Sequence, residues 1–261
     1  MSDKGLEERY LAACAIAREA GALARTLFTR REMGTFELKG EQDYLTEADG
    51  EVERLIIKRL AEAFPDDTVF GEEGGGQMSS QVWVIDPIDG TANFARGIPY
   101  FCVSIAFVRG GRTAVGAICN PMLNELYAAR CGGGATLNAT PLRISTITDI
   151  RQATIELGWS TRRPLADYVA LIDRVTRAGG GFLRAGSGAL GIAYVAAGRI
   201  DGYAELHINA WDALAGLLMV EEAGGRTNDF LGGDGLTKGN PVLAATPGLY
   251  DALAAATGIG R

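Results

Sequence analysis

The stretch from residue 82 to residue 94 constrains the fold of this chain more than any other. It starts with Val-Trp-Val-Ile at 82–85, a short apolar run typical of a buried strand. Pro87 is expected to stop that strand, because proline has no backbone N–H to donate. In a regular strand Asp86 and Asp89 would point to opposite faces, whereas a turn at 87–88 brings both carboxylates together. Gly90-Thr91 then predicts a helix start, where free N–H groups can hold an anion.

Two carboxylates beside an anion site suit chemistry in which metal ions bridge the protein and a phosphate group. The alternative is an Asp-Pro turn followed by a helix cap, and each half of that pattern is common. The complete string Asp-Pro-Ile-Asp-Gly-Thr is much rarer than either half. We therefore interpret this stretch as part of a metal site.

Length and composition indicate a globular chain. Its 261 residues suffice for one large domain or two closely packed halves, and it is 47% hydrophobic and 22% charged. No apolar run approaches the roughly 18 residues of a membrane span, and the charged N-terminus shows no secretory signal. The four cysteines contain no Cys-x-x-Cys pair, so reduced thiols in a cytoplasmic protein are expected.

The charge balance excludes several kinds of site. A net charge of −7 without a Lys/Arg-rich run argues against binding nucleic acid, which needs clustered positive charge. The single histidine, His207, argues against a His-rich zinc site and against a phosphohistidine mechanism. An acidic protein that acts on a phosphorylated anion needs cations between the two, so some of the acids are expected to be metal ligands.

The pattern of elements predicts an α+β fold. Helices are expected at 4–30 and 46–64, a loop at 39–43 and a strand at 68–71, followed by an antiparallel meander at 102–108, 113–119 and 125–129. From about residue 150, strands at 153–157, 200–206 and 242–245 alternate with helices at 164–176, 188–197 and 211–223, before a C-terminal helix. We expect one unit of two halves, about 1–148 (α+β) and about 149–261 (α/β).

Two motifs resemble the signatures of the inositol monophosphatase family. The first is D-P-[IL]-D-G-T-x-N-F, matched at 86–94, and the second is W-D-x-x-x-G-x-x-x-x-x-E-A-G-G, matched at 211–225. Gly-Glu-Glu at 71–73 and Thr-x-x-Asp at 46–49 lie upstream at the family's expected places. The resemblance covers nearly the whole chain and implies a layered α-β-α-β-α sandwich, as in the sugar phosphatases, with the site between the two halves.

The resemblance also implies a ligand set for Mg²⁺. One ion would take Glu72, Asp86 and the carbonyl of Ile88, and a second would take Asp86, Asp89 and Asp212. Asp212 has a structural alternative, because an aspartate near a helix start is favoured by capping and by the helix dipole. Glu73 is expected to lie next to these ligands without binding the metal itself.

Catalytic roles are implied for Asp49, Glu72 and Thr91. Thr91 and Asp49 resemble the family's water-activating pair, and the metal lowers the pKa of the attacking water. Asp49 also fits a capping-box acid, and both roles are compatible. The resemblance implies substrate contacts from residues near the metals and from a second loop: Asp89, Gly90, Thr91, Gly186, Ser187, Gly188, Glu205 and Asp212.

Two of these contacts carry alternatives. Gly186-Ser187-Gly188 also fits an ordinary glycine-rich loop before a helix. Glu205, seven residues before Asp212, is placed to bind sugar hydroxyls, although a solvated acid at a strand end is the alternative. Lys39 resembles a mobile-loop lysine of the family, and a surface lysine is the alternative.

The expected function is Mg²⁺-dependent hydrolysis of a phosphate monoester, most simply myo-inositol monophosphate to inositol and phosphate. Other substrates in the superfamily are histidinol phosphate, a nucleotide 3′-phosphate and fructose 1,6-bisphosphate. Ala92, where a second Thr is common, and the segment 206–210 depart from the family pattern and leave substrate identity open. A regulatory member that binds RNA polymerase or RNA is the alternative of a different class.

The expected partners are a small phosphorylated polyol and a second copy of the chain, with no membrane and no nucleic acid. The homodimer is implied by the family and by the apolar meander at 102–129, which needs cover on both faces. The resemblance further implies inhibition by lithium.

Overall fold

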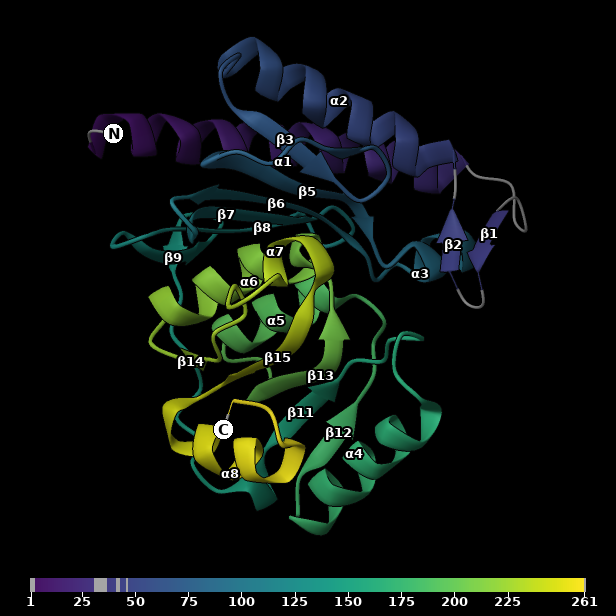
Figure 1. The fold of residues 1–261 in the computed structure, drawn as a ribbon, viewed down its shortest axis with the longest axis vertical. Coiled ribbons are helices and arrows are strands. Elements are labelled where there is room, and N and C mark those ends of the chain that lie inside the picture. Colours follow the sequence, from purple (N-terminus) through teal and green to yellow (C-terminus); the bar gives the residue numbers. More distant parts are fainter. Residues whose placement is uncertain (1–2, 31–36, 41–42, 46, 261) are drawn as a thin grey trace.

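The protein is built from two β-sheets separated and covered by helices (Figure 1). The computed structural model describes residues 3–30, 37–40, 43–45 and 47–260. A separate two-stranded ribbon pairs β1 (Glu37–Gly40) with β2 (Asp43–Leu45). Lys39 therefore lies on a short strand, where a loop over 39–43 was predicted, and Thr46 lies outside the described residues.

The first large sheet has the order β10-β9-β8-β7-β6-β5-β3-β4. Its strands in chain order are β3 (Thr68–Gly71), β4 (Gly75–Gly76), β5 (Gln81–Asp89), β6 (Cys102–Arg109), β7 (Arg112–Asn120), β8 (Glu125–Arg130), β9 (Gly134–Leu137) and β10 (Thr140–Pro141). β6, β7 and β8 form the predicted antiparallel meander, within one or two residues of the expected limits. The short strands β4, β9 and β10 were not predicted, because pieces this short show little periodicity.

Helices α1 (Asp3–Arg30) and α2 (Glu47–Ala63) cover the outer face of this sheet (Figure 1). Small buried residues, Ala13, Ala17, Ala20 and Ala24, recur along α1 and let it lie close to the strands. Where α1 crosses β7, a Cβ added at Gly21 would lie 2.6 Å from the sulfur of Cys119. The close packing here requires glycine.

Helices α5 (Gly188–Ala196) and α6 (Ala210–Glu222) lie between the two sheets (Figure 1). Both are apolar on all sides, as expected for helices buried on opposite faces. A Cβ added at Gly116 of β7 would lie 2.9 Å from Cα of Ala215 on α6. The meander is thus covered by α1 on one face and α6 on the other, so the cover that was expected from a second chain comes from the same chain.

The second sheet has the order β12-β11-β13-β15-β14, with β11 parallel to both of its neighbours. Its strands are β11 (Thr154–Leu157), β12 (Gly181–Leu183), β13 (Gly202–Ile208), β14 (Arg226–Thr227) and β15 (Asn240–Ala245). Helices α4 (Leu165–Arg177) and α8 (Pro247–Thr257) lie on its outer side (Figure 1). The remaining elements are α3 (Thr91–Arg96), η1 (Ile150–Gln152) and α7 (Gly235–Lys238). The layers confirm the predicted α-β-α-β-α sandwich.

The path of β5 differs from the prediction at Pro87. The strand continues through Pro87 to Asp89, and its pairing with β6 shifts between these residues: Asp86 lies opposite Ser104 and Asp89 opposite Cys102. Ser104 and Cys102 are two residues apart and share a face of β6, so Asp86 and Asp89 also share a face. The convergence of the two carboxylates was expected from a turn that ends the strand. In the structure, the register shift at a bulge brings the two carboxylates to one face. The bulge also accommodates Pro87 within the sheet.

Among the described helices, none combines the length and the apolar character needed to cross a membrane. Cys14, Cys102, Cys119 and Cys131 are all free thiols, as predicted.

Candidate active site

Three carboxylates from two distant segments meet where β5 ends against α6. Asp86 and Asp89 come from the bulge of β5, and Asp212 comes from the first turn of α6. One oxygen from each lies within 4.8 Å of the others. Asp212 also accepts a hydrogen bond from the backbone N–H of Asn209 (3.3 Å), so it caps α6 as well as joining the cluster. Asp212 therefore both caps α6 and contributes a carboxylate to the cluster.

The cluster concentrates negative charge in a buried place. Burial raises the pKa of Asp86 well above its ordinary value, and the charges of Glu72, Asp212 and Asp89 raise it further. The pKa values of Asp89 and Asp212 are raised in the same direction, first by burial. Holding several carboxylates together is costly unless a cation compensates them, and hard divalent cations prefer oxygen ligands. The donor set therefore fits a divalent cation.

Glu72 follows β3 directly and approaches the cluster from a third segment. Its backbone N–H donates to the carbonyl of Ile85 (3.3 Å), which fixes the chain beside β5. Its carboxylate is near enough to raise the pKa of Asp86, although it is outside the group of three acids. Glu73 extends the same loop, and its N–H donates to Glu53 of α2 (3.2 Å).

Thr91 joins the cluster to Asp49. Its hydroxyl is a donor within reach of two acceptors, the Ile88 carbonyl (2.9 Å) and Asp49 Oδ1 (3.1 Å). Asp49 is fully buried in the first turn of α2. Gly90, which precedes α3, has φ 99°, a left-handed conformation that favours glycine. This glycine turns the chain from the bulge of β5 directly into the helix that carries Thr91.

The start of α5 is directed at Asp89. The Ser187 hydroxyl donates to Asp89 Oδ2, and the backbone N–H groups of Gly188 (3.2 Å) and Ala189 (2.8 Å) also donate to this carboxylate. These hydrogen bonds lower the pKa of Asp89 against the effect of burial. Ser187 and Gly188 were expected to contact substrate. In the structure their donors orient an acid of the cluster.

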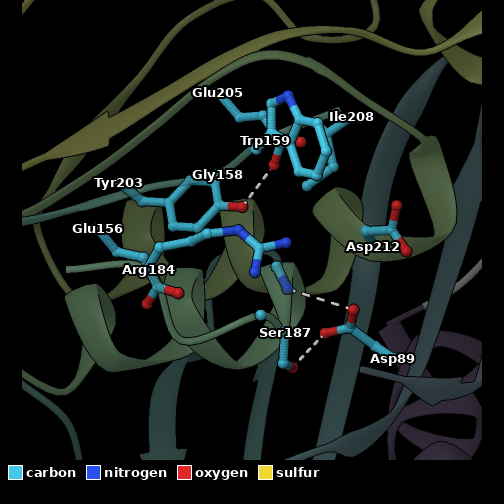
Figure 2. Close-up of a pocket in the computed structure, with 12 residues that line it drawn as sticks. Asp89, Glu156, Gly158, Trp159, Arg184, Ser187, Tyr203, Glu205, Ile208 and Asp212 are labelled. Atoms are coloured by element: carbon cyan, nitrogen blue, oxygen red, sulfur yellow. Dashed lines mark hydrogen bonds between the residues drawn. The ribbon is translucent and has the colours of Figure 1, made fainter. Parts of the chain in front are cut away.

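A pocket of about 170 Å³ opens beside Asp89 and Asp212. Gly186, Ser187 and Gly188 form one side, and strands β11 and β13 carry the residues of another (Figure 2). Glu205 lines the pocket from within β13, where a strand end was predicted, and it is only 7% exposed. The alternative of a solvated acid is therefore wrong.

Tyr203 orients Glu205. The Tyr203 hydroxyl donates to Glu205 Oε2 (2.6 Å), as Figure 2 shows. Burial raises the pKa of Glu205 to about 7, while this hydrogen bond lowers it. A Cβ added at Gly158 would lie 2.5 Å from the Tyr203 hydroxyl oxygen, so the glycine makes room for the pair. The pocket thus contains two buried acids outside the cluster, Glu205 and Glu156.

The sequence profile of the inositol monophosphatase family matches residues 5–259. The chain belongs to the inositol monophosphatase family. It is 41% identical over 235 residues to a protein of Pasteurella multocida named Nus factor SuhB, and the match covers 88% of each chain.

Solved structures agree with this assignment. The extragenic suppressor protein suhB of Bartonella henselae aligns with a TM-score of 0.88 at 33% identity, covering 96% of this chain and 98% of that one. The structure titled inositol monophosphate bound SaIMPase-II aligns with a TM-score of 0.77 at 27% identity, covering 96% and 92%. SaIMPase-II corresponds to inositol monophosphatase II of Staphylococcus aureus.

Several residues around this site were not singled out from the sequence. Asn93 donates to the carbonyls of Tyr100 (2.8 Å) and Ala185 (2.9 Å), and so ties α3 to the loop before α5. Glu53 accepts from the N–H groups of the Glu72 loop. For Asn93 a signal existed, since it belongs to the first motif. The partners of Glu53 are about 20 residues away and leave no local pattern.

Proposed function

We propose that this protein hydrolyses phosphate monoesters with Mg²⁺ as cofactor, and that myo-inositol monophosphate is its substrate. The observation that carries the proposal is the cluster of Asp86, Asp89 and Asp212 beside a pocket that contains a buried acid. The S. aureus relative solved with inositol monophosphate supports the choice of substrate. The four free thiols are compatible with the cytoplasm.

Mg²⁺ would be held by Glu72, Asp86, Asp89, Asp212 and the carbonyl of Ile88. When bound, it would neutralise phosphate charge and lower the pKa of water near the phosphorus atom. Asp89 keeps its orientation through the donors of Ser187, Gly188 and Ala189. Asp89 is therefore preorganised at the pocket, where Asp212 lies beside it.

Thr91 and Asp49 handle the proton of the attacking water. A water that donates to Thr91 Oγ1 is aligned by the hydroxyl, whose own hydrogen points to Asp49 Oδ1 at 3.1 Å. The buried Asp49 carboxylate accepts the proton that passes along this pair. The Ile88 carbonyl (2.9 Å) is the other acceptor of this single hydroxyl hydrogen, and it is released when the hydroxyl donates to Asp49.

Glu205 reads the leaving group. Its carboxylate accepts hydrogen bonds from polyol hydroxyls, and Tyr203 holds one of its oxygens in place (2.6 Å). Hydrogen bonds to a charged group are worth roughly 1.5–3 kcal/mol, which is enough to discriminate between alcohols. We also propose a homodimer and inhibition by lithium, both from family membership. Light scattering at micromolar concentration and a lithium titration at subsaturating Mg²⁺ test them.

Phosphate release from a substrate panel tests the proposal. The panel contains inositol 1-phosphate, histidinol phosphate, a nucleotide 3′-phosphate and fructose 1,6-bisphosphate, each with Mg²⁺ and with EDTA. We expect the highest kcat/KM for inositol 1-phosphate and no turnover in EDTA. Higher efficiency on another member of the panel would reassign the substrate, and turnover in EDTA would remove the metal.

A second function is favoured by the name Nus factor SuhB that a 41% identical relative carries. A Nus factor acts in transcription, so a regulatory complex with RNA polymerase is the second proposal. Co-purification with RNA polymerase, repeated with Asp86→Asn, separates the two roles, because binding that survives loss of the metal site is independent of catalysis. An RNA-binding assay run in parallel distinguishes direct RNA binding, which the net charge of −7 disfavours.

A further inference from the structure

Arg184 is a cation that lines the pocket and takes no part in the steps proposed for Thr91, Asp49 and Glu205. It lies between β12 and α5, is exposed, and lines the same pocket as Glu205 and Asp212. Figure 2 shows its guanidinium extending into the space between Glu205 and Asp89. Its guanidinium carbon lies 5.7 Å from the ring centre of Trp159. Within the described ranges its side chain forms no hydrogen bond or ion pair.

The absence of an ion pair at Arg184 is unusual because two acids, Glu156 and Glu205, lie nearby. Burial raises the pKa of Glu156 and of Glu205 to about 7, and the charge of Arg184 opposes that rise at both. The guanidinium is thus close enough to act on both carboxylates, yet it makes an ion pair with neither. Glu156 is instead held by the N–H of Ala185 (3.0 Å), and Glu205 is held by Tyr203 (2.6 Å).

Trp159 helps to keep Arg184 in the pocket. A guanidinium within about 6 Å of an indole ring is attracted to its face. The indole Nε1–H of Trp159 is buried and has no hydrogen-bond partner among the described residues. The pocket lining therefore carries unpaired donors on two side chains, Arg184 and Trp159.

We propose that Arg184 is a specificity-determining residue that donates hydrogen bonds to hydroxyl oxygens of the substrate's leaving group. The inference rests on the proposed function and deepens it. Neighbouring hydroxyls on a polyol both donate and accept, so Glu205 as acceptor and Arg184 as donor form a complementary pair. The planar guanidinium, with several N–H groups in a fixed fork, reads two adjacent oxygens. The substrate class is a phosphate monoester of a polyol with vicinal hydroxyls.

Kinetics on two substrates test the assignment. Arg184→Ala and Arg184→Lys are compared on inositol 1-phosphate and on p-nitrophenyl phosphate, with Arg112→Ala as a control at an exposed arginine on β7. We expect Arg184→Ala to lower kcat/KM on inositol 1-phosphate about tenfold or more, mainly through KM, and to change p-nitrophenyl phosphate less than about twofold. Arg184→Lys should lose less, because it keeps the charge but loses the fork.

A binding measurement separates this inference from the proposed function. The affinity for inositol 1-phosphate is measured by calorimetric titration of the wild type and of Arg184→Ala. Ca²⁺ replaces Mg²⁺ in this titration, because Ca²⁺ also takes oxygen ligands. Weaker binding by Arg184→Ala supports the assignment even if the wild type releases no phosphate, in which case only the proposed function fails.

Three results would overturn the assignment of Arg184. Equal losses on both substrates would place it against the phosphate group. Kinetics and binding like those of Arg112→Ala would leave it a solvated surface arginine. Absence of both turnover and binding in the wild type would refute this inference and the proposed function together. Circular dichroism of each variant verifies that it is folded.

Discussion

Replacement of Glu53 is the sharpest test of how the site is assembled. Glu53 lies one helical turn after Asp49 on α2 and is only 6% exposed. Its Oε1 accepts hydrogen bonds from the N–H groups of Glu73 and Gly74, both at 3.2 Å. One buried carboxylate thereby holds the loop that carries Glu72. We expect Glu53→Ala to destabilise the fold and to weaken Mg²⁺ binding, although Glu53 itself is not a ligand.

The magnitude follows from the two hydrogen bonds. A bond to a charged group contributes roughly 1.5–3 kcal/mol, and two bonds that share one oxygen contribute less than twice that amount. Glu53→Ala should therefore lose about 2–4 kcal/mol of unfolding free energy. At about 2–4 °C per kcal/mol for a chain of this size, the Tm falls by about 4–16 °C. Glu53→Gln keeps an acceptor oxygen but no charge, and should lose about half as much.

The assay is thermal unfolding together with calorimetric titration of Mg²⁺, and Glu51→Ala is the matched control. Glu51 lies on the same helix, two residues away, and is exposed. The Mg²⁺ midpoint should rise about tenfold in Glu53→Ala and stay unchanged in Glu51→Ala. If Glu53→Ala matches the wild type in Tm and in Mg²⁺ affinity, as Glu51→Ala should, the two hydrogen bonds do not position Glu72 and the reasoning is refuted.

Four other perturbations test the remaining assignments. Asp86→Asn should abolish Mg²⁺-dependent turnover and calorimetric Mg²⁺ binding while the circular dichroism spectrum stays native. Wild-type activity in this variant would refute the metal assignment. Thr91→Ala should lower kcat far more than it raises KM, since its bonds matter most in the transition state, and a normal kcat would remove it from the mechanism. Glu205→Gln should lose about ten- to a hundredfold in kcat/KM on inositol 1-phosphate and little on p-nitrophenyl phosphate, whereas equal losses would indicate support of the metals or the fold. Burial raises the pKa of Glu156 from 4.5 to about 7, so its penalty on folding is absent below pH 4.5 and complete above pH 7. Denaturation from pH 4 to pH 8 should then show Glu156→Gln gaining stability relative to the wild type as pH rises, by at most about 3 kcal/mol, and a constant difference would contradict the argument.

Most helices and strands and the acids of the cluster were predictable because their signals are local, whereas the layered arrangement was implied by the family resemblance. An apolar run such as residues 82–85 indicates a buried strand wherever it lies, and helical periodicity marks α2 and α4 within one or two residues of their observed limits. The Asp-Pro-Ile-Asp-Gly-Thr string and the Trp-Asp pair likewise identify themselves by type and spacing. Each of these signals spans fewer than about 20 residues of chain.

The path through Pro87 was not predictable in the same way. A proline after an apolar run normally ends a strand, and the expectation of a turn followed from that rule. In the structure, β5 pairs with β6 on both sides of Pro87, at Asp86 and at Asp89, and this pairing carries the strand through the proline as a bulge. Partners in neighbouring strands decided the conformation, and a rule about a single residue does not include them.

The sequence alone indicated the three acids that meet in the cluster, Asp86, Asp89 and Asp212, and the tertiary structure decided what each of them touches. Asp89 is held by Ser187 and Gly188, about 100 residues further along the chain, through two residues that were predicted to contact the substrate. Arg184 faces the pocket because β12 ends beside β11 in the second sheet. Contacts of this kind depend on how helices and sheets stack, and stacking is set by the shapes of whole surfaces. A short stretch of sequence records the residue types at a site but not the surfaces that bring them together.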